Sequence, residues 1–152
     1  MRVGICDDDV KWCQKAEEII KEYGKKTDME IETLCFTQEE ELNRYTGDPL
    51  SVIFMDVELG EKSGIDLAGQ VNKRWKNCQI VYLTNYLNYA TEIYHTAHTF
   101  FVLKEQFQDR IGEVFGKILH ILEQKSERLV FSVIGGKEIV LAPEDILYFE
   151  QT

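Results

Sequence analysis

The sequence predicts an α/β fold, in which a five-stranded parallel sheet with helices on both faces forms a (βα)5 three-layer sandwich, followed by a short β-rich C-terminal tail. Two observations predict it. Between residues 1 and 125, short apolar runs alternate five times with stretches of helical periodicity, and strands that alternate with helices form parallel sheets. One run, residues 52–55, is apolar throughout, which is typical of a central strand buried on both faces.

The first two β-α units occupy residues 1–46. Residues 2–6 form a short apolar strand, and Asp9 is expected to cap a helix that ends near Gly24. Residues 29–36 alternate like a strand, and residues 37–40 (Thr-Gln-Glu-Glu) have the spacing of a capping box that starts a second helix.

The next three units follow the same rhythm. The third strand leads through a glycine-containing loop into a helix, the fourth is followed by a weak, polar helix candidate, and the fifth leads into a helix with a clear apolar stripe. The elements are strand 52–55, loop 58–64, helix 65–75, strand 80–83, helix 88–95, strand 99–103 and a helix carrying Phe107, Ile111, Val114, Phe115, Ile118, Ile121 and Leu122.

Beyond Lys125 the pattern changes. Residues 129–134 and 138–141 are strand-like and flank Gly135-Gly136, which is a hairpin signal. Pro143 then precedes a third apolar run, residues 146–149. We therefore divide the chain into a domain at 1–125 and a tail at 126–152.

Charge and cysteine content restrict the function classes. The net charge is −10, with −7 in residues 1–126 and −3 in residues 127–152, so neither part has the basic balance of a nucleic-acid-binding surface. The four cysteines form no C-x-x-C pair and are expected to be buried free thiols rather than a zinc site. No apolar run approaches a membrane span. We expect a soluble, cytoplasmic protein.

Polar side chains follow the strands where each strand ends. Asp7, Asp8 and Asp9 follow the first strand, Asp56 the third, Thr84 the fourth and Lys104 the fifth. Because the carboxyl ends of parallel strands meet at one edge of the sheet, we expect these groups to converge on one cleft. Each residue alone has an ordinary interpretation, as a helix cap or a solvated charge, so the prediction depends on the combination.

Clustered carboxylates repel one another unless a cation neutralises them, and hard oxygen ligands suit Mg²⁺. A metal ion, a lysine and a hydroxyl around one carboxylate are the groups that phosphoryl transfer to that carboxylate requires. The pattern predicts Asp56 as the nucleophile.

These motifs resemble the receiver domain of two-component response regulators, with a CheY-like, flavodoxin-like fold. The matching segments cover residues 1–125 and are Ile5-Cys6-Asp7-Asp8, Phe54-Met55-Asp56-Val57-Glu58, Leu83-Thr84-Asn85 and Phe101-Val102-Leu103-Lys104.

The resemblance implies a role for each matching residue. Asp7, Asp8 and Asp56 hold Mg²⁺ together with the backbone carbonyl of Glu58, and Asp56 accepts the phosphoryl group. Thr84 is the switch hydroxyl, Lys104 bridges to the phosphoryl group, and Phe101 takes the place of the aromatic switch residue. The implied donor is a sensor histidine kinase.

The chain departs from the family pattern after Lys104. The family usually has a proline there, often after a cis peptide bond, whereas this chain has Glu105. A cis bond before another residue type costs about 3–4 kcal/mol, so we expect the Lys104–Glu105 peptide to be trans.

The tail resembles the opening of a LytTR-type DNA-binding domain, especially Pro143-Glu144-Asp145-Ile146-Leu147-Tyr148-Phe149-Glu150. The resemblance implies a transcriptional regulator that binds DNA as a full-length protein and homodimerises when phosphorylated. We expect this chain to carry only the first strands of that domain. Because three short strands bury little surface by themselves, we expect residues 128–152 to pair or pack with another molecule, and no specific DNA binding by the chain.

Three other readings remain open. Haloacid-dehalogenase phosphatases use a similar aspartate, hydroxyl, lysine and Mg²⁺, but need a second aspartate where this chain has Glu58. A flavin-binding module would need a phosphate-binding loop where Asp7–Asp9 lie. A receiver-like protein that is never phosphorylated would act only as a partner surface. We expect a regulator rather than a turnover enzyme.

Overall fold

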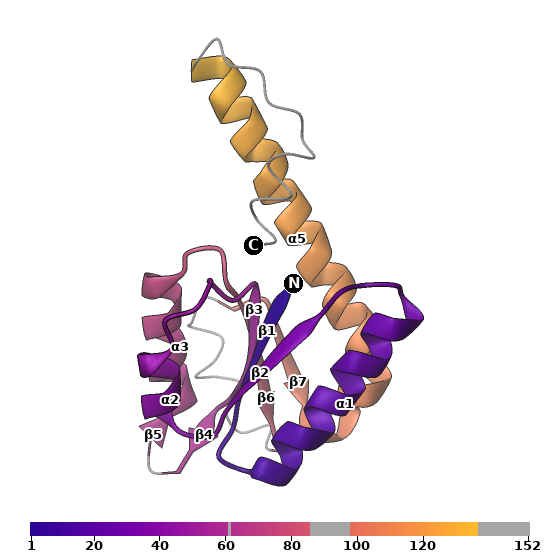
Figure 1. Ribbon diagram of the computed structural model, residues 1–152, viewed down its shortest axis with the longest axis vertical. Helices are drawn as coiled ribbons and strands as arrows, with labels where there is room; N and C mark the ends of the chain where they lie inside the picture. Colours follow the sequence, from indigo (N-terminus) through magenta and orange to yellow (C-terminus); the bar gives the residue numbers. More distant parts are fainter. Residues whose placement is uncertain (61, 86–97, 137–152) are drawn as a thin grey trace.

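The computed structural model describes residues 1–60, 62–85 and 98–136, with side chains described through Lys125. Five parallel strands form one sheet in the order β2-β1-β3-β6-β7, which confirms the predicted fold class (Figure 1). They are β1 (Arg2–Cys6), β2 (Glu32–Phe36), β3 (Val52–Asp56), β6 (Gln79–Thr84) and β7 (Phe100–Leu103). A two-stranded antiparallel hairpin, β4 (Glu58–Leu59) with β5 (Lys62–Ser63), was not predicted.

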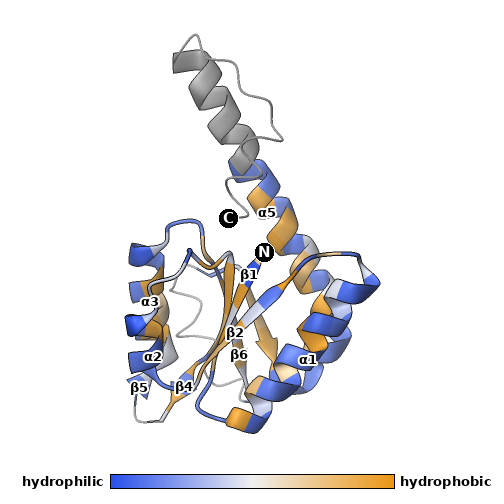
Figure 2. Cartoon of the chain, viewed as in Figure 1, coloured by the Kyte–Doolittle hydropathy of each residue, from blue (hydrophilic) through white to orange (hydrophobic). Residues whose placement is uncertain are grey.

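Helices cover both faces of the sheet (Figure 1). Helices α1 (Val10–Lys26) and α5 (Phe107–Gly136) lie on one face, and α2 (Glu39–Arg44) and α3 (Gly64–Arg74) lie on the other. The short 3-10 turn η2 (Lys104–Gln106) joins β7 to α5. Figure 2 shows hydrophobic residues along the inner strands of the sheet and hydrophilic residues on the outward sides of the helices, the pattern expected of helices that pack on a sheet. The predicted helix at 88–95 lies outside the described residues.

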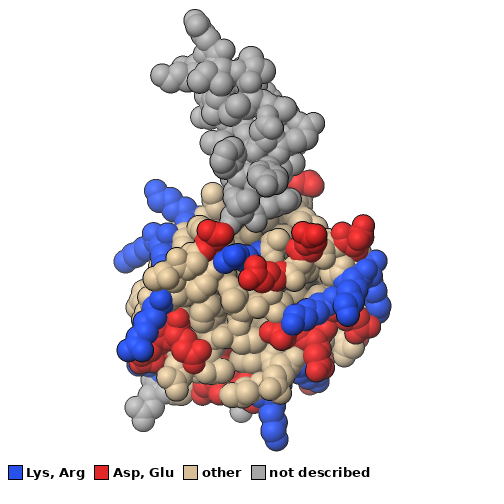
Figure 3. Space-filling view, viewed as in Figure 1, with Lys and Arg blue, Asp and Glu red and all other residues tan. Residues whose placement is uncertain are grey.

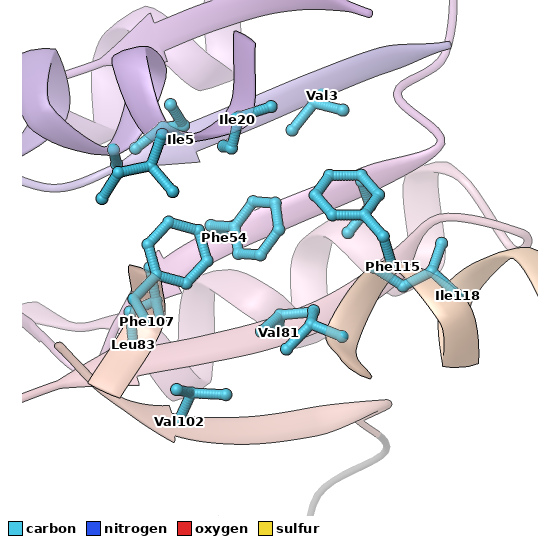
Figure 4. Packing of buried hydrophobic residues seen from close by; sticks show 14 of the residues in the cluster. Val3, Ile5, Ile20, Phe54, Val81, Leu83, Val102, Phe107, Phe115 and Ile118 are labelled. Carbon is cyan, nitrogen blue, oxygen red and sulfur yellow. The ribbon is translucent and has the colours of Figure 1, made fainter. Parts of the chain in front are cut away.

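Two cores fill the space between the layers. On the α1/α5 face, Phe54 of β3 contacts the rings of Phe107 and Phe115 at centroid distances of 5.2 and 5.9 Å (Figure 4). On the other face, Met55 and Tyr82 are fully buried against α3. Every residue of β3 is buried, as the uninterrupted apolar run at 52–55 predicted, and every residue of β6 is buried as well.

The predicted N-terminal cap is confirmed for α1 and is wrong for α2. The Asp9 carboxylate accepts hydrogen bonds from the backbone N–H groups of Lys11 and Trp12, which confirms it as the N-cap of α1. The predicted capping box at 37–40 is wrong, because Gln38 is the N-cap of α2 without a side-chain bond. The Thr37 hydroxyl instead lies 2.7 Å from Glu41 Oε1, so it bonds a side chain rather than the helix backbone.

The tail prediction fails where the structure describes it. Residues 129–134, predicted as a strand, belong to α5, which continues to Gly136. A helix satisfies its backbone hydrogen bonds within its own segment, whereas an isolated hairpin leaves its strand edges unpaired, and this favours continuation of α5. The predicted strands beyond residue 136 lie outside the described residues, and the boundary at 125 stays a prediction.

Candidate phosphoryl-acceptor site

The predicted acidic cluster lies at the carboxyl edge of the sheet. Asp7 follows β1, and Asp56 is the last residue of β3, the neighbouring strand. One carboxylate oxygen each from Asp7, Asp8 and Asp56 lies within 4.8 Å of the other two. Asp7 and Asp56 are buried, at 1% and 8% exposure, whereas Asp8 is exposed. The cluster is therefore open to solvent on the side of Asp8.

Lys104 reaches this cluster from the end of β7. Its Nζ lies 2.5 Å from Asp7 Oδ2 and 3.3 Å from Asp56 Oδ2. The ammonium is buried, and so are both carboxylates. One lysine thus faces two buried carboxylates and the exposed Asp8, which leaves the cluster with an excess of negative charge.

Burial and mutual repulsion shift the ionisation of the cluster. Desolvation and the neighbouring Asp7 raise the pKa of Asp56 to about 6, although Lys104 and the N–H of Glu58 oppose the shift. Burial also raises the pKa of Asp7. Burial disfavours the charged form of Lys104, but its bonds to the two carboxylates outweigh that effect and raise its pKa. The site therefore favours an additional cation.

Backbone N–H groups fix the orientation of the three carboxylates. Asp7 Oδ1 accepts from the N–H of Asp9 at 2.9 Å, and Asp56 Oδ1 accepts from the N–H of Glu58 at 3.2 Å. Asp8 Oδ2 accepts from the N–H of Gly60 at 3.0 Å. Gly60 has φ of +59°, a left-handed conformation that glycine adopts without strain. The glycine-containing loop thus holds Asp8 in the cluster.

Gly64 lets α3 begin directly behind Asp56. A Cβ at this position would lie 1.8 Å from the Asp56 carbonyl oxygen, so no larger residue fits. The N–H of Gly64 also donates to the Val57 carbonyl at 2.7 Å. This close approach fixes the backbone that carries the carboxylate.

The remaining predicted residues, Thr84, Phe101 and Glu58, differ in how deeply their side chains are buried. Thr84 ends β6 and is 1% exposed, one register position beyond Leu83, the partner of Asp56. Phe101 lies in β7 beside Tyr82 and is partly buried against the core on the α3 face. The side chain of Glu58 is exposed. The structure therefore brings Asp7, Asp8, Asp56 and Lys104 into contact, with Thr84 at the adjacent strand end.

The sequence reasoning missed some neighbours of the site. Lys104 Nζ lies 5.3 Å from the centroid of the Trp12 ring, and the Cys13 thiol donates to the Asp7 carbonyl at 3.3 Å. Both residues belong to the first turns of α1, which starts directly after the acidic run. Their position within a turn of that run was the available signal. The Lys104–Glu105 peptide is trans, as predicted, since the described residues contain no cis bond.

Figure 3 shows basic side chains mainly at the edges of the visible face, with acidic side chains beside them, and the net charge of the chain is −10. Among the described residues, no helix has both the length and the apolar character needed to cross a bilayer.

Residues 3–115 match the family described as the response regulator receiver domain. Accessory gene regulator protein A of Staphylococcus aureus is 25% identical over 169 residues, which cover 100% of this chain and 69% of that protein. Transcriptional regulatory protein NatR of Bacillus subtilis is 22% identical, covering 100% of this chain and 64% of NatR. Sensory transduction protein LytR of Staphylococcus epidermidis is 30% identical over 80 residues, 53% of this chain and 32% of LytR. The matched region of this chain thus covers about a third of the length of LytR and just under two thirds of the length of NatR.

Solved structures support the fold. The response regulator TrrA of Thermotoga maritima, in complex with Mg(2+)-BeF, superposes with a TM-score of 0.66 at 24% identity, covering 77% of this chain and 97% of that one. The REC domain of AraT from Geobacillus stearothermophilus gives a TM-score of 0.66 at 24% identity, covering 82% and 96%.

Proposed function

Because this chain belongs to the response regulator receiver domain family, we propose that Asp56 accepts a phosphoryl group in an Mg²⁺-dependent reaction and that the modification controls an output. The observation that carries the proposal is the buried contact of Lys104 with Asp7 and Asp56, beside the exposed Asp8. These are the charged groups that phosphoryl transfer to a carboxylate uses.

The residues present fit a magnesium ion. Three carboxylates offer oxygens within 4.8 Å of one another, and Lys104 is the one lysine that contacts them among the residues the structure describes. We propose that Asp7, Asp8 and Asp56 hold the ion, together with the backbone carbonyl of Glu58. Magnesium, when bound, supplies positive charge to the phosphoryl oxygens. Hard oxygen ligands with one side open to water suit this ion.

The chain's own groups then perform the transfer. An Asp56 carboxylate oxygen attacks phosphorus and forms the new O–P bond, while the bond between phosphorus and the donor breaks and its electron pair leaves with the donor. Lys104, 3.3 Å from Asp56 Oδ2, neutralises a phosphoryl oxygen, and the Thr84 hydroxyl hydrogen-bonds another. The N–H of Glu58 keeps the carboxylate oriented.

The proposed output is a change of surface. When Thr84 turns toward the phosphoryl group, the half-buried Phe101 can repack on the α3 face of the sheet. We propose that this switch promotes homodimerisation, that a sensor histidine kinase is the donor, and that the full-length regulator binds DNA. The protein is then a regulator and not a turnover enzyme. All four cysteines are free and three are buried, which is consistent with the cytoplasm.

The test is phosphorylation of the whole chain by acetyl phosphate with Mg²⁺. We expect the intact mass to rise by one phosphoryl group, and Asp56→Asn to abolish the rise. Asp66→Asn is the matched control, because Asp66 is an exposed carboxylate in the first turn of α3. Modification that persists in Asp56→Asn, or that needs no divalent cation, would contradict the proposal.

A further inference from the structure

Trp12 contacts the proposed site from the first turn of α1. The Lys104 ammonium lies 5.3 Å from the centroid of its ring. The ring of Phe107, which is fully buried, lies at a centroid distance of 6.1 Å from the Trp12 ring. Trp12 itself is half-buried against the α1/α5 core. The indole is therefore fixed by packing and presents its ring to the ammonium.

An indole face attracts a cation through its quadrupole, and the attraction grows when the pair is removed from water. Here the Lys104 side chain is 8% exposed. A lysine side chain is flexible along its four carbons, so its position depends on what surrounds its charge. The described partners of that charge are Asp7, Asp56 and the Trp12 ring.

This inference rests on the proposed function, in which two of these partners also bind the metal ion. Asp7 and Asp56 are also the proposed ligands of Mg²⁺, and an oxygen engaged by a divalent ion attracts a lysine less. The Trp12 ring is neutral and takes no part in metal ligation, so its hold on Lys104 does not compete with the metal.

We propose that Trp12 is a positioning residue that holds the Lys104 ammonium beside Asp56 when Asp7 is engaged by Mg²⁺. The ring acts through Lys104 and does not touch the phosphoryl group. Its removal should slow phosphorylation of Asp56 while leaving the metal ligands in place.

Three variants of the whole chain separate positioning from packing. Trp12→Leu keeps an apolar side chain but removes the aromatic face, and Trp12→Phe keeps an aromatic face. Lys15→Gln is the control, because Lys15 Nζ lies 5.9 Å from the same ring but belongs to an exposed residue. The rate of Asp56 phosphorylation by acetyl phosphate is measured at saturating Mg²⁺, and the affinity for Mg²⁺ alone is measured from the metal-dependent shift in thermal unfolding.

We expect Trp12→Leu to slow phosphorylation about three- to tenfold, the range that a partly desolvated cation–π contact supports. Trp12→Phe should recover most of the rate, and Lys15→Gln should match the wild type. The affinity for Mg²⁺ should change less than about twofold in all three variants, because none of them alters a proposed metal ligand. A wild-type rate in Trp12→Leu, or equal losses in the leucine and phenylalanine variants, would overturn the proposal.

A spectroscopic test does not depend on phosphorylation. The chain contains two tryptophans, and Trp75 packs far from the site against Arg74 and Tyr45. In a Trp75→Phe background, Trp12 fluorescence of the metal-free protein should shift when Lys104→Met removes the cation, and should not shift with Lys15→Gln. An unchanged spectrum in Lys104→Met overturns the inference. If the wild type accepts no phosphoryl group, the proposed function is overturned instead. The fluorescence measurement then still tests whether the Trp12 ring contacts Lys104.

Discussion

Lys104 and Lys62 make nearly the same ion-pair geometry in two different places. Lys104 Nζ lies 2.5 Å from Asp7 and 3.3 Å from Asp56, and Lys62 Nζ lies 2.5 Å from Glu39 and 3.4 Å from Glu40. The Lys104 side chain is 8% exposed, whereas that of Lys62, on the β4–β5 hairpin, is 59% exposed. Distances alone therefore do not distinguish a structural contact from a functional one.

The two clusters differ in the free energy that is lost when a charged group has no partner of opposite charge. Water screens Lys62 and Glu40 and still reaches the half-buried Glu39, so these pairs add little stability. At the carboxyl edge, Asp7 and Asp56 have lost most of their hydration, and Lys104 offsets part of that loss. Of these two clusters, the one at the carboxyl edge holds its excess negative charge on buried carboxylates, and a metal ion would neutralise that charge.

The largest expected effect follows removal of the buried cation. Lys104→Met leaves Asp7 and Asp56 buried without it, and in metal-free protein we expect the free energy of unfolding to fall by about 2–3 kcal/mol, somewhat below the loss typical of a broken buried pair because the carboxylates can take up a proton. Urea unfolding at pH 7 in the presence of a chelator measures this change.

Addition of Mg²⁺ to the Lys104→Met variant should restore part of the lost stability, because the ion replaces the missing positive charge. Phosphorylation by acetyl phosphate should still be slow, since Lys104 no longer meets the phosphoryl oxygens. A variant as stable as the wild type without metal would show that the ion pair does not compensate the buried carboxylates.

A smaller effect of opposite sign is expected when one acid is neutralised. In metal-free protein, Asp56→Asn removes a carboxylate that is buried beside Asp7, while Asp7 still pairs with Lys104. Relief of that repulsion and burial should raise the free energy of unfolding by about 1–2 kcal/mol at pH 7. The stabilising effect of Mg²⁺ should be much weaker in this variant than in the wild type.

The same change has a pH signature. The pKa of Asp56 is raised to about 6 from an ordinary value of 3.8, so the folded state binds this proton more tightly than the unfolded state. The destabilisation is full above about pH 6 and is relieved as the pH falls toward 4. As the pH falls from 7 to 5, the free energy of unfolding of the metal-free wild type should therefore rise relative to that of Asp56→Asn. A difference in free energy of unfolding that stays constant over this range would contradict the raised pKa of Asp56.

The sequence predicted the sheet because its strands are unambiguous. An uninterrupted apolar run such as 52–55 admits few alternatives to a buried strand, and the α5 stripe from Phe107 to Leu122 admits few alternatives to a helix. The β4–β5 hairpin escaped prediction because each of its strands has only two residues, too few for a periodic pattern. Residues 129–134 were predicted as a strand because they are strand-like and precede Gly135-Gly136, a hairpin signal, but α5 continues through them.

The site was predictable to the extent that topology determines it. Asp7, Asp56 and Lys104 lie at the carboxyl ends of β1, β3 and β7, and a parallel sheet brings these ends to one edge. Contacts that depend on side-chain packing were not predictable in this way. Trp12 reaches Lys104 only because of how α1 packs against η2 and α5, and Gly64 is required only because α3 starts against the Asp56 carbonyl.

The smallest effect is expected at the exposed lysine. Lys62→Met removes both of its ion pairs, yet Glu40 is mostly exposed and Glu39 keeps 20% of its surface in water, so the midpoint of urea unfolding should stay within experimental scatter of the wild type. Glu39 and Glu40 raise the pKa of the exposed Lys62, but solvent screening keeps that interaction from adding to stability. Any difference should vanish in high salt, because ions screen exposed charges. Phosphorylation should be unaffected as well, since the N–H of Gly60 and not Lys62 holds Asp8. A salt-resistant loss comparable to that of Lys104→Met would mean that burial is not what separates the two lysines, and that the hairpin contributes to the charge balance of the site.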